Sequence, residues 1–380
     1  MILQKTIFKC LRKNVRWGST QTNLSSLYKD VFKDFDNYVP KIIDDGLANA
    51  TFIKSAAVKS RIKEVSEYYL IGRRPVQGEF MAFAYDTLEN PEVISEELLK
   101  KMQVITCTVE MVQTYFFFWD DFEDRCKTRC GKLCWHLRPD TGSLALIDAC
   151  IMRSFINELI RQNFTAELRD NILRIYNGVY FNGSIGQYLD TIAARSNNYD
   201  NFTLAQYNTT NEMKSSFYAI KSPILLGLAL ANKFNEESYN LVDNICEDIG
   251  ILVQIHNDVI DVLNIDGSVT GKNATDIQER KCSWVAVTVL EKCNTEQRRI
   301  FEENYGSWDP KKIDRIRKIY EEFDVLQMYR QEEKARYEKF LKKVNALPKN
   351  ATPSAEFFYK FYDLLKTFTR DTTNFMYIKH

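Results

Sequence analysis

The clearest signal of the fold lies in residues 98–124, which read LLKKMQVITCTVEMVQTYFFFWDDFED. Apolar side chains recur there at three- and four-residue intervals, at Leu98, Met102, Ile105, Val109, Val112 and Phe116. This spacing is typical of the buried face of an α-helix. The stretch contains neither glycine nor proline, the two residues that most disfavour a helix interior. The sequence therefore predicts a long, mostly buried helix that ends in a cluster of carboxylates.

A second long helix is predicted from residue 241 to residue 262. Its apolar positions are Leu241, Ile245, Ile249, Leu252, Ile255, Val259 and Val262. Gly (14) and Pro (8) are scarce in the 380 residues, and strand-like alternation is short and rare. From residue 27 onward there is no linker-like tract. We therefore expect one all-α domain over residues 29–380, built as a single bundle of long helices.

Both predicted helices end in acidic residues. Asp120, Asp121 and Asp124 close the first helix, and at helical spacing their carboxylates can project from one side. The second helix ends at Asn257, Asp258 and Asp261. Oxygen ligands without histidine or thiolate suit a hard ion such as Mg²⁺, which bridges protein and phosphate oxygens. The alternative is two solvated acidic helix ends.

Basic residues that could meet a phosphate accompany both clusters. Taken singly, each is better explained as a surface residue. The residues are Arg125, Lys127, Arg129 and Lys132 after the first cluster, Lys272 and Lys281 after the second, and Lys214 between them.

The remaining composition limits the partners and the location. Basic and acidic side chains number 51 each, which gives no reason to expect nucleic acid as a partner. No apolar run approaches the roughly 20 residues of a membrane span. Residues 1–28 contain five basic and no acidic side chains and an amphipathic start, the pattern of a mitochondrial transit peptide. A disordered basic arm, with a cytoplasmic protein, is the alternative.

Several ordered blocks resemble the farnesyl diphosphate synthases. These blocks are Asp120-Asp121-Phe122-Glu123-Asp124 with Thr128-Arg129 and Cys134-Trp135; Gly186-Gln187 with Asp190; Lys214-Ser215 with Phe217-Tyr218; Gln254 to Asp261; Thr270-Gly271-Lys272; and Lys281 to Trp284. The resemblance covers roughly residues 35–375. It implies the isoprenoid synthase fold around a deep apolar cavity, three Mg²⁺ ions between the two acidic motifs, a prenyl diphosphate substrate and a homodimer.

The resemblance also implies roles for individual residues. Asp120, Asp121, Asp124, Asn257, Asp258 and Asp261 would hold the metal. The diphosphate would be bound, and its departure assisted, by Arg129, Lys214, Gln254, Lys272 and Lys281. Tyr115 and Phe116 lie where the family sets chain length, so they would limit the substrate to about fifteen carbons.

The chain departs from the family pattern where isopentenyl diphosphate would bind. Gln77 stands where a Gly-Lys-x-x-Arg segment has arginine, and Cys130 replaces the second arginine of an Arg-Arg pair. Gln113 and Arg129 are retained, and Arg74 could stand for the lysine. Two lost charge-assisted hydrogen bonds remove about 3–6 kcal/mol, or roughly 10²- to 10⁴-fold in affinity.

These departures indicate an activity that does not use isopentenyl diphosphate. The pattern resembles the insect terpene synthases of pheromone-type pathways that arose from farnesyl diphosphate synthases. On this interpretation the enzyme ionises farnesyl diphosphate and releases a sesquiterpene hydrocarbon or alcohol. The alternatives are a short-chain prenyltransferase, making geranyl or farnesyl diphosphate, and a non-catalytic partner subunit of a synthase.

Overall fold

The computed structural model describes residues 31–32, 34–196, 198–263 and 274–378. The segment for which the sequence predicts a transit peptide or a basic arm, residues 1–28, lies outside the described residues. Lys272 also lies outside them. The predictions made for that segment and for Lys272 therefore stay predictions.

The described chain is helical except for one short antiparallel ribbon, in which Thr128 pairs with Leu133 and Arg129 with Lys132. The all-α prediction is confirmed. The elements are α3 (Phe35–Asn49), α4 (Ala56–Glu67), α5 (Val76–Glu89), α6 (Glu96–Glu123), β1 (Thr128–Arg129), β2 (Lys132–Leu133), η2 (Trp135–Leu137), α7 (Leu144–Asn163), α8 (Ala166–Arg195), η3 (Tyr199–Asn201), α9 (Leu204–Asn211), η4 (Glu212–Lys221), α10 (Ser222–Leu230), α11 (Glu236–Leu263), α12 (Trp284–Lys292), α13 (Thr295–Asn304), α14 (Pro310–Glu322), α15 (Val325–Asn345) and α16 (Ala355–Ile378).

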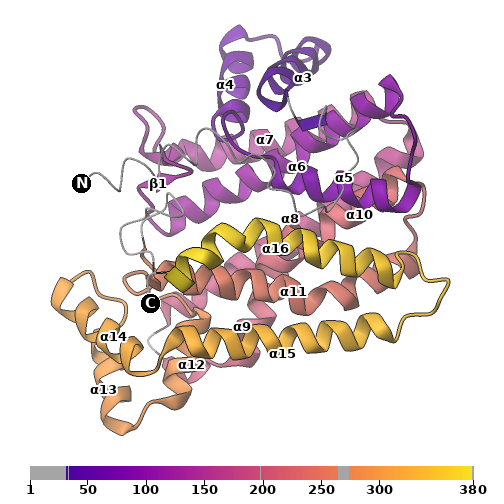
Figure 1. Cartoon of the computed structure of the whole chain (residues 1–380). Helices are drawn as coiled ribbons and strands as arrows, with labels where there is room; N and C mark the ends of the chain where they lie inside the picture. The colour runs from indigo at the N-terminus through magenta and orange to yellow at the C-terminus, as the bar shows by residue number, and fades with distance from the viewer. Residues whose placement is uncertain (1–30, 33, 197, 264–273, 379–380) are drawn as a thin grey trace.

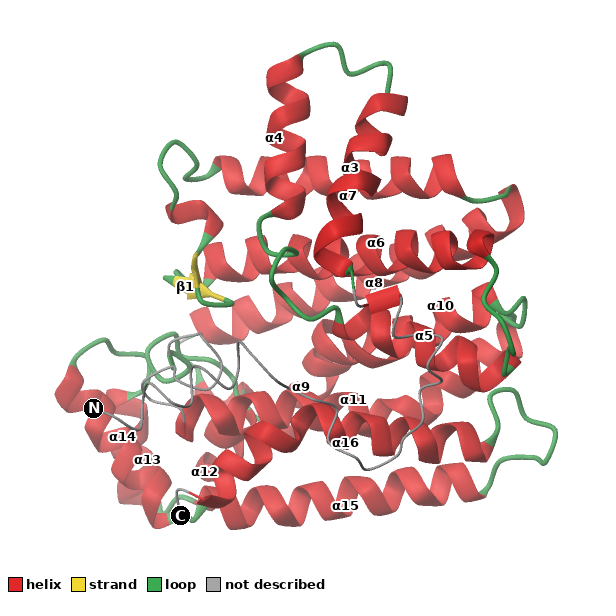
Figure 2. Ribbon diagram, turned by 45° about the horizontal axis from the view of Figure 1, so that its top comes forward, coloured by secondary structure: helices red, strands yellow, loops and turns green. Residues whose placement is uncertain are grey.

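The long helices lie roughly side by side in stacked layers (Figures 1 and 2). Helices α6, α7 and α8 form the upper part in Figure 1, and α11, α15 and α16 form the lower part. The short helices α3 and α4 stand against the upper layer, while α13 and α14 project from the lower left. The carboxyl-terminal ends of α6 and α11 both point to the left in this view, where β1 also lies.

Helix α6 shows why the apolar pattern folds as predicted. Ser95 caps its start by accepting a hydrogen bond from the Leu98 backbone N–H, and Glu96 and Glu97 occupy the positive end of the helix dipole. Its middle is buried almost all round, from Met102 to Val112. A helix buried on most sides forms the centre of a bundle rather than its surface, and α6 therefore provides a rigid support for the carboxylates at its end.

The core divides into two apolar clusters. The larger joins α3 to α8, α10, the first half of α11 and the ends of α15 and α16, and the smaller joins the second half of α11 to α9, α12, α13 and α14. Helix α11 belongs to both clusters, so it fixes the two parts relative to each other. The second acidic motif lies on the part of α11 that the smaller cluster holds.

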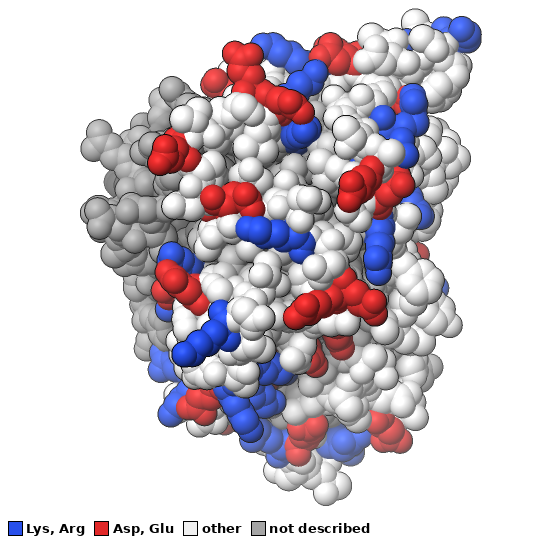
Figure 3. All heavy atoms as spheres, turned by 90° about the vertical axis from the view of Figure 1, so that its right-hand side faces the viewer, with Lys and Arg blue, Asp and Glu red and all other residues white. Residues whose placement is uncertain are grey.

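None of the helices in the described ranges has the length and apolar character that a membrane span requires. Figure 3 shows acidic and basic side chains interspersed over the face that looks to the right in Figure 1. That distribution fits the balanced charge of the sequence.

Candidate active site

The first acidic cluster meets three basic side chains at the end of α6. Asp120 accepts from Arg129 Nη2 at 2.6 Å and from Lys214 Nζ at 3.2 Å. Asp124 pairs with Lys281 Nζ at 2.6 Å. The cations come from β1, η4 and the segment before α12. The structure therefore brings together five of the residues that the sequence assigned to one site.

Asp190 on α8 is the centre of this arrangement. Its Oδ2 accepts from Lys214 Nζ at 2.6 Å and from Lys281 Nζ at 2.9 Å. Burial raises the pKa of Asp190, but the charges of Lys214 and Lys281 outweigh it and hold the pKa well below its usual range. Burial lowers the pKa of both lysines, but Asp190 more than offsets it, so both stay charged.

Asp190 had no role in the site predicted from the sequence. Its position four residues after Gly186, in a block that resembles the family, could have indicated one. One helical turn separates i from i+4, so the two residues share a face of α8.

Asp121 points away from Asp190. Its side chain is 1 % exposed and pairs with Arg129, whose Nε lies 2.8 Å from Asp121 Oδ1. Its other oxygen accepts from the Tyr69 hydroxyl at 3.4 Å. Asp121 therefore anchors Arg129 on the inner side of the helix end, while Asp120 and Asp124 face α8.

The second acidic motif is held by hydrogen bonds. Asp258 is buried and accepts from Gln254 Nε2, the Tyr207 hydroxyl and the Trp284 backbone N–H, each at 2.8 Å. Burial is the main cause that raises the pKa of Asp258, and these three donors act against it. Asp258 thus joins α9, α11 and α12 at one point.

The two other members of this motif lie differently. Asn257 is exposed. Asp261 accepts from the backbone N–H groups of Thr275 and Asp276 at 3.3 and 3.2 Å. Asn257 is therefore the member of the motif that is open to solvent, and Asp261 also holds the chain just after residues 264–273.

A π-helix links the two motifs. Residues 212–221 form η4, a wide helical turn of a kind found mostly at functional sites. Consecutive residues of η4 reach different partners: Lys214 meets Asp120 and Asp190, while Ser215 Oγ donates to Gln254 Oε1 at 2.7 Å. Helix η4 therefore connects the carboxylates of α6 and α8 with the motif on α11.

Two glycines allow this approach. A Cβ at Gly186 of α8 would clash with the backbone of Lys214, and a Cβ at Gly250 of α11 would clash with Ser216. Only glycine lets both helices come this close to η4.

The two aromatic residues predicted to limit chain length take different positions. Tyr115 is 6 % exposed and packs edge-to-face on Tyr180 of α8, with ring centroids 5.1 Å apart. Phe116 lies against Gly183, where a Cβ would clash with the ring, and its centroid is 6.1 Å from that of Tyr218. Phe116 is one helical turn before Asp120, so it is the better placed of the two to meet a chain that extends from the acidic cluster.

The region that departs from the family pattern, near Gln77 and Cys130, contains several cations. The Arg129 and Arg73 guanidinium carbons lie 4.6 and 5.4 Å from the Phe117 ring centroid. Lys132 Nζ donates to the backbone carbonyls of Tyr68 and Ile71, just before Arg73. Burial is the main cause that lowers the pKa of Lys132, and the Arg73 charge acts in the same direction.

Gln77 and Arg74 do not contribute charge to this cluster. Gln77 is buried with an unpaired Oε1. Arg74 forms two hydrogen bonds to Glu79, at 2.7 and 2.8 Å. Arg73, by contrast, uses Nη2 for Glu110, and its buried Nη1 has no hydrogen-bond partner. Arg73 is therefore the arginine of this segment with a donor to spare.

The chemistry of these residues fits Mg²⁺. Asp120, Asp121, Asp124 and Asp190 carry four negative charges, against three positive charges on Arg129, Lys214 and Lys281, so a diphosphate needs additional cations here. In the described ranges no three acidic, histidine or cysteine side chains converge as a closed metal cage. Carboxylate oxygens are the protein ligands that Mg²⁺ takes, together with several waters and substrate phosphate oxygens.

Comparisons with known proteins identify the family of this chain. Residues 59–323 match the family model of polyprenyl synthetases. The chain is 31% identical to farnesyl pyrophosphate synthase of Rattus norvegicus over 306 residues, covering 79% of this chain and 85% of the relative. It is 28% identical to that of the insect Nezara viridula over 323 residues, covering 85% and 79%.

Solved structures show the same fold. A farnesyl diphosphate synthase of T. brucei, complexed with a bisphosphonate, superposes with a TM-score of 0.80 at 23% identity, covering 87% of this chain and 97% of that one. The chain therefore belongs to the polyprenyl synthetase family, whose members are enzymes that use Mg²⁺. The predicted family and the isoprenoid synthase fold are confirmed.

The predicted terpene synthase activity is wrong. The relatives are farnesyl pyrophosphate synthases, which are prenyltransferases, so the prenyltransferase alternative is the better supported one. The error has a physical cause. The prediction counted the arginines missing at positions 77 and 130 and did not count Arg73, whose guanidinium lies over the same Phe117 ring as that of Arg129.

Proposed function

We propose that this chain is a short-chain prenyltransferase that joins an allylic diphosphate to isopentenyl diphosphate, giving geranyl or farnesyl diphosphate. The observation that carries the proposal is the shared contact of Arg129 and Arg73 with Phe117, at 4.6 and 5.4 Å. One cation belongs to the acidic cluster and the other to the segment before α5. A coupling enzyme needs two diphosphate sites this close together.

The allylic diphosphate would bind at the ends of α6, α8 and α11. Its Mg²⁺ ions, three as the family resemblance implies, would be held by Asp120, Asp121, Asp124, Asn257, Asp258 and Asp261, and they supply charge stabilisation for the departing diphosphate. Three protonated side chains can donate hydrogen bonds to the oxygens of this diphosphate, those of Lys214, Lys281 and Arg129.

The reaction balances without any other reagent. The C1–O bond of the allylic substrate breaks and its electron pair leaves with diphosphate. The π electrons of isopentenyl diphosphate form the new carbon–carbon bond to C1. Loss of one proton from the resulting cation restores a double bond. The protein's task is to place the two substrates and to exclude water, which would trap the cation.

The second diphosphate would meet Arg73, whose Nη1 is free of hydrogen bonds, with Lys132 close by. Gln113 of α6 donates to the Tyr218 hydroxyl at 3.2 Å. Burial raises the pKa of Tyr218, and the Gln113 hydrogen bond and the Arg73 and Arg129 charges act against it. Arg73 and Lys132 would replace the positive charge of the two arginines that the family pattern has at positions 77 and 130.

The direct test gives the full chain dimethylallyl and isopentenyl diphosphates with Mg²⁺ and identifies products by liquid chromatography and mass spectrometry. We expect geranyl and farnesyl diphosphates. Arg73→Gln should raise KM for isopentenyl diphosphate about 10- to 10²-fold, one charge-assisted hydrogen bond, with KM for the allylic substrate unchanged. Arg169→Gln on the surface of α8 is the matched control. Hydrolysis of the allylic substrate without any elongation would reject the proposal.

We also propose that the enzyme is a homodimer that buries an apolar face of α7 and α8. These neighbouring helices expose Ile147 (56%), Phe181 (70%), Tyr188 (64%) and Ile192 (43%). The three residues of α8 lie seven and four positions apart, which puts them on one helix face. Large apolar side chains gathered in this way mark an interaction surface.

Phe181→Glu should weaken this dimer about 10- to 30-fold, because it places a charge in the apolar contact. Sedimentation velocity over a range of protein concentrations measures the change. Trp308→Glu, which alters a side chain 55% exposed on another part of the molecule, should leave the association unaltered. A monomeric wild-type protein at micromolar concentration would refute the proposed dimer.

A further inference from the structure

One buried carboxylate holds the segment that leads into α5. Glu110 lies in the middle of α6 and is 0% exposed. Its Oε2 accepts from Arg73 Nη2 at 2.7 Å, and its backbone carbonyl accepts from the same nitrogen at 3.3 Å. Its Oε1 accepts from the backbone N–H groups of Gln77 and Gly78, at 2.8 and 3.3 Å. Both carboxylate oxygens of Glu110 therefore bind this segment.

The start of α5 depends on these hydrogen bonds. The first N–H groups of a helix have no partner within the helix and need one from elsewhere. Pro75 occupies the N-cap position of α5 and provides no side-chain cap. Glu110 instead binds the N–H groups of the second and third helical residues, and its negative charge complements the positive end of the helix dipole. Glu110 therefore fixes the start of α5 and the Arg73 guanidinium relative to each other.

Arg73 is held from two points along α6. Gln113 and Phe117 follow Glu110 by three and seven positions, so the three side chains share one face of the helix. The Arg73 guanidinium carbon lies 5.4 Å from the Phe117 ring centroid. The Nη1 of Arg73 is buried and has no hydrogen-bond partner among the described residues, so this donor is left for a ligand.

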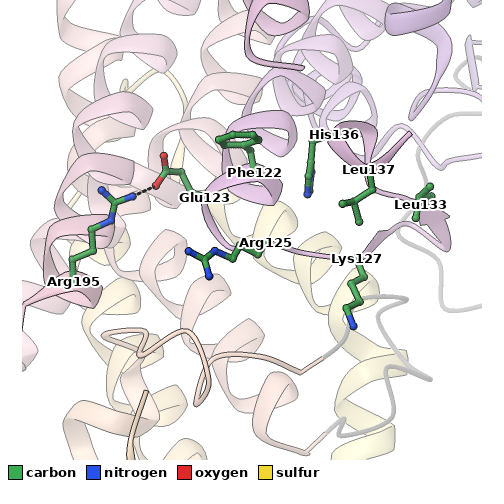
Figure 4. A pocket seen from close by; sticks show the side chains of 8 residues that line it. All are labelled: Phe122, Glu123, Arg125, Lys127, Leu133, His136, Leu137 and Arg195. Atoms are coloured by element: carbon green, nitrogen blue, oxygen red, sulfur yellow. Dashed lines mark hydrogen bonds and ion pairs between the residues drawn. The ribbon is translucent and has the colours of Figure 1, made fainter. Parts of the chain in front are cut away.

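Arg73 differs in this respect from two cations that follow the first acidic cluster. Arg125 and Lys127 are exposed, and Figure 4 shows both in the lower part of a pocket beside the end of α6. A long exposed side chain loses much of its rotamer freedom when it binds an anion, and that loss weakens binding. The Arg73 side chain, 14% exposed, is already fixed by Glu110 in the folded protein. It can therefore bind an anion at a lower entropic cost.

We propose that Glu110 is a positioning residue for the second substrate. It holds Arg73 so that Nη1 points to the diphosphate of isopentenyl diphosphate, and it does not itself touch the substrate. This inference rests on the proposed function for the identity of that ligand. The alternative is that Arg73 is only the counter-ion that a buried carboxylate requires.

Glu110→Gln separates these two roles, because they predict opposite effects. Without a positioning role, the variant removes a negative charge beside an anion site, which should strengthen binding of isopentenyl diphosphate or leave it unchanged. With that role, the amide oxygen of the glutamine can still accept from the two backbone N–H groups, but its NH₂ group faces Arg73 and cannot accept a hydrogen bond. Arg73 is then released, and binding becomes weaker.

Calorimetry with isopentenyl diphosphate and the full chain measures this effect, in EDTA so that the metal-dependent acidic cluster does not contribute. We expect Glu110→Gln to raise Kd about tenfold, because one charge-assisted hydrogen bond is no longer aligned. KM for isopentenyl diphosphate should rise by the same factor, with KM for the allylic diphosphate unchanged. In the Arg73→Gln background, Glu110→Gln should change Kd less than about twofold, because Glu110 acts through Arg73.

Glu79→Gln is the matched control. It also removes a buried carboxylate that pairs with an arginine of this segment, since Glu79 is 3% exposed and lies 2.7 Å from Arg74 Nη2. It should not weaken binding, because Arg73 stays in place. Glu110→Asp is a second variant that keeps the charge but withdraws it from Arg73 by one methylene. It should weaken binding as well, even if Glu110→Gln fails to fold.

Unchanged or tighter binding by Glu110→Gln would overturn the inference, and so would a further loss of affinity in the Arg73→Gln background. If the wild type binds isopentenyl diphosphate but elongates no allylic substrate, the proposed function fails and the calorimetry still decides the role of Glu110. If the wild type elongates and Glu110→Gln keeps the wild-type Kd and KM, only this inference fails. A wild type that neither binds nor elongates rejects both.

Discussion

Asp120→Asn should lower kcat/KM for the allylic diphosphate about 10²- to 10³-fold, or roughly 3–4 kcal/mol of transition-state stabilisation. Asp120 contacts both Arg129 and Lys214, at 2.6 and 3.2 Å. The asparagine keeps the shape of the side chain but loses the charge that holds both cations and a metal ion. The loss should appear in kcat, because those charges act mainly on the departing diphosphate.

Steady-state kinetics at saturating Mg²⁺ measure this effect, with Glu321→Gln on the surface of α14 as the control. A higher Mg²⁺ concentration should restore little of the lost rate. If Asp120→Asn retains more than a third of the wild-type kcat, Asp120 has no part in the chemistry.

Asp190→Asn should destabilise the fold by about 3–5 kcal/mol at pH 7, because it leaves Lys214 and Lys281 without their shared buried partner. Equilibrium urea unfolding of the metal-free protein measures the difference. Asp314→Asn, 67% exposed, should change the free energy of unfolding by less than about 0.5 kcal/mol. A stability equal to wild type would show that the two lysines find other partners.

The destabilisation should depend on pH in a defined direction. The folded-state pKa of Asp190 is held below its unfolded value, because the two lysine charges outweigh the effect of burial. Its contribution is therefore fully present above the unfolded pKa of about 4 and is lost as the pH falls through the lower folded value. The wild type and Asp190→Asn should thus converge in stability at acidic pH.

The sequence predicted the bundle and the two helices that carry the site. The apolar spacing before Asp120 and Asp258 specified α6 and α11, because a buried helix repeats its pattern over many turns. Local spacing contains this information directly. The family resemblance, and not the spacing, gave roles to Lys214 and Lys281, which the structure places at the acidic cluster.

Contacts between distant segments could not be predicted in the same way. The hydrogen bond of Tyr207 to Asp258 joins residues 51 positions apart, and the contact of Arg73 with Phe117 depends on how α5 packs against α6. The mistaken activity arose here. The prediction compared Gln77 and Cys130 with the family pattern position by position, and it therefore missed Arg73, which lies over the same Phe117 ring as Arg129.

The ion pairs around Asp190 have a further consequence for how ligands enter. Without ligand, Lys214 and Lys281 each form ion pairs with two carboxylates. Binding must break these ion pairs, because the metal takes the carboxylates and the diphosphate takes the lysines. A metal ion alone would displace the lysines without offering them an anion, and a diphosphate alone would take the lysines and leave the carboxylates facing one another. Each ligand should therefore bind weakly alone and tightly with the other, and by reciprocity the two gains are equal.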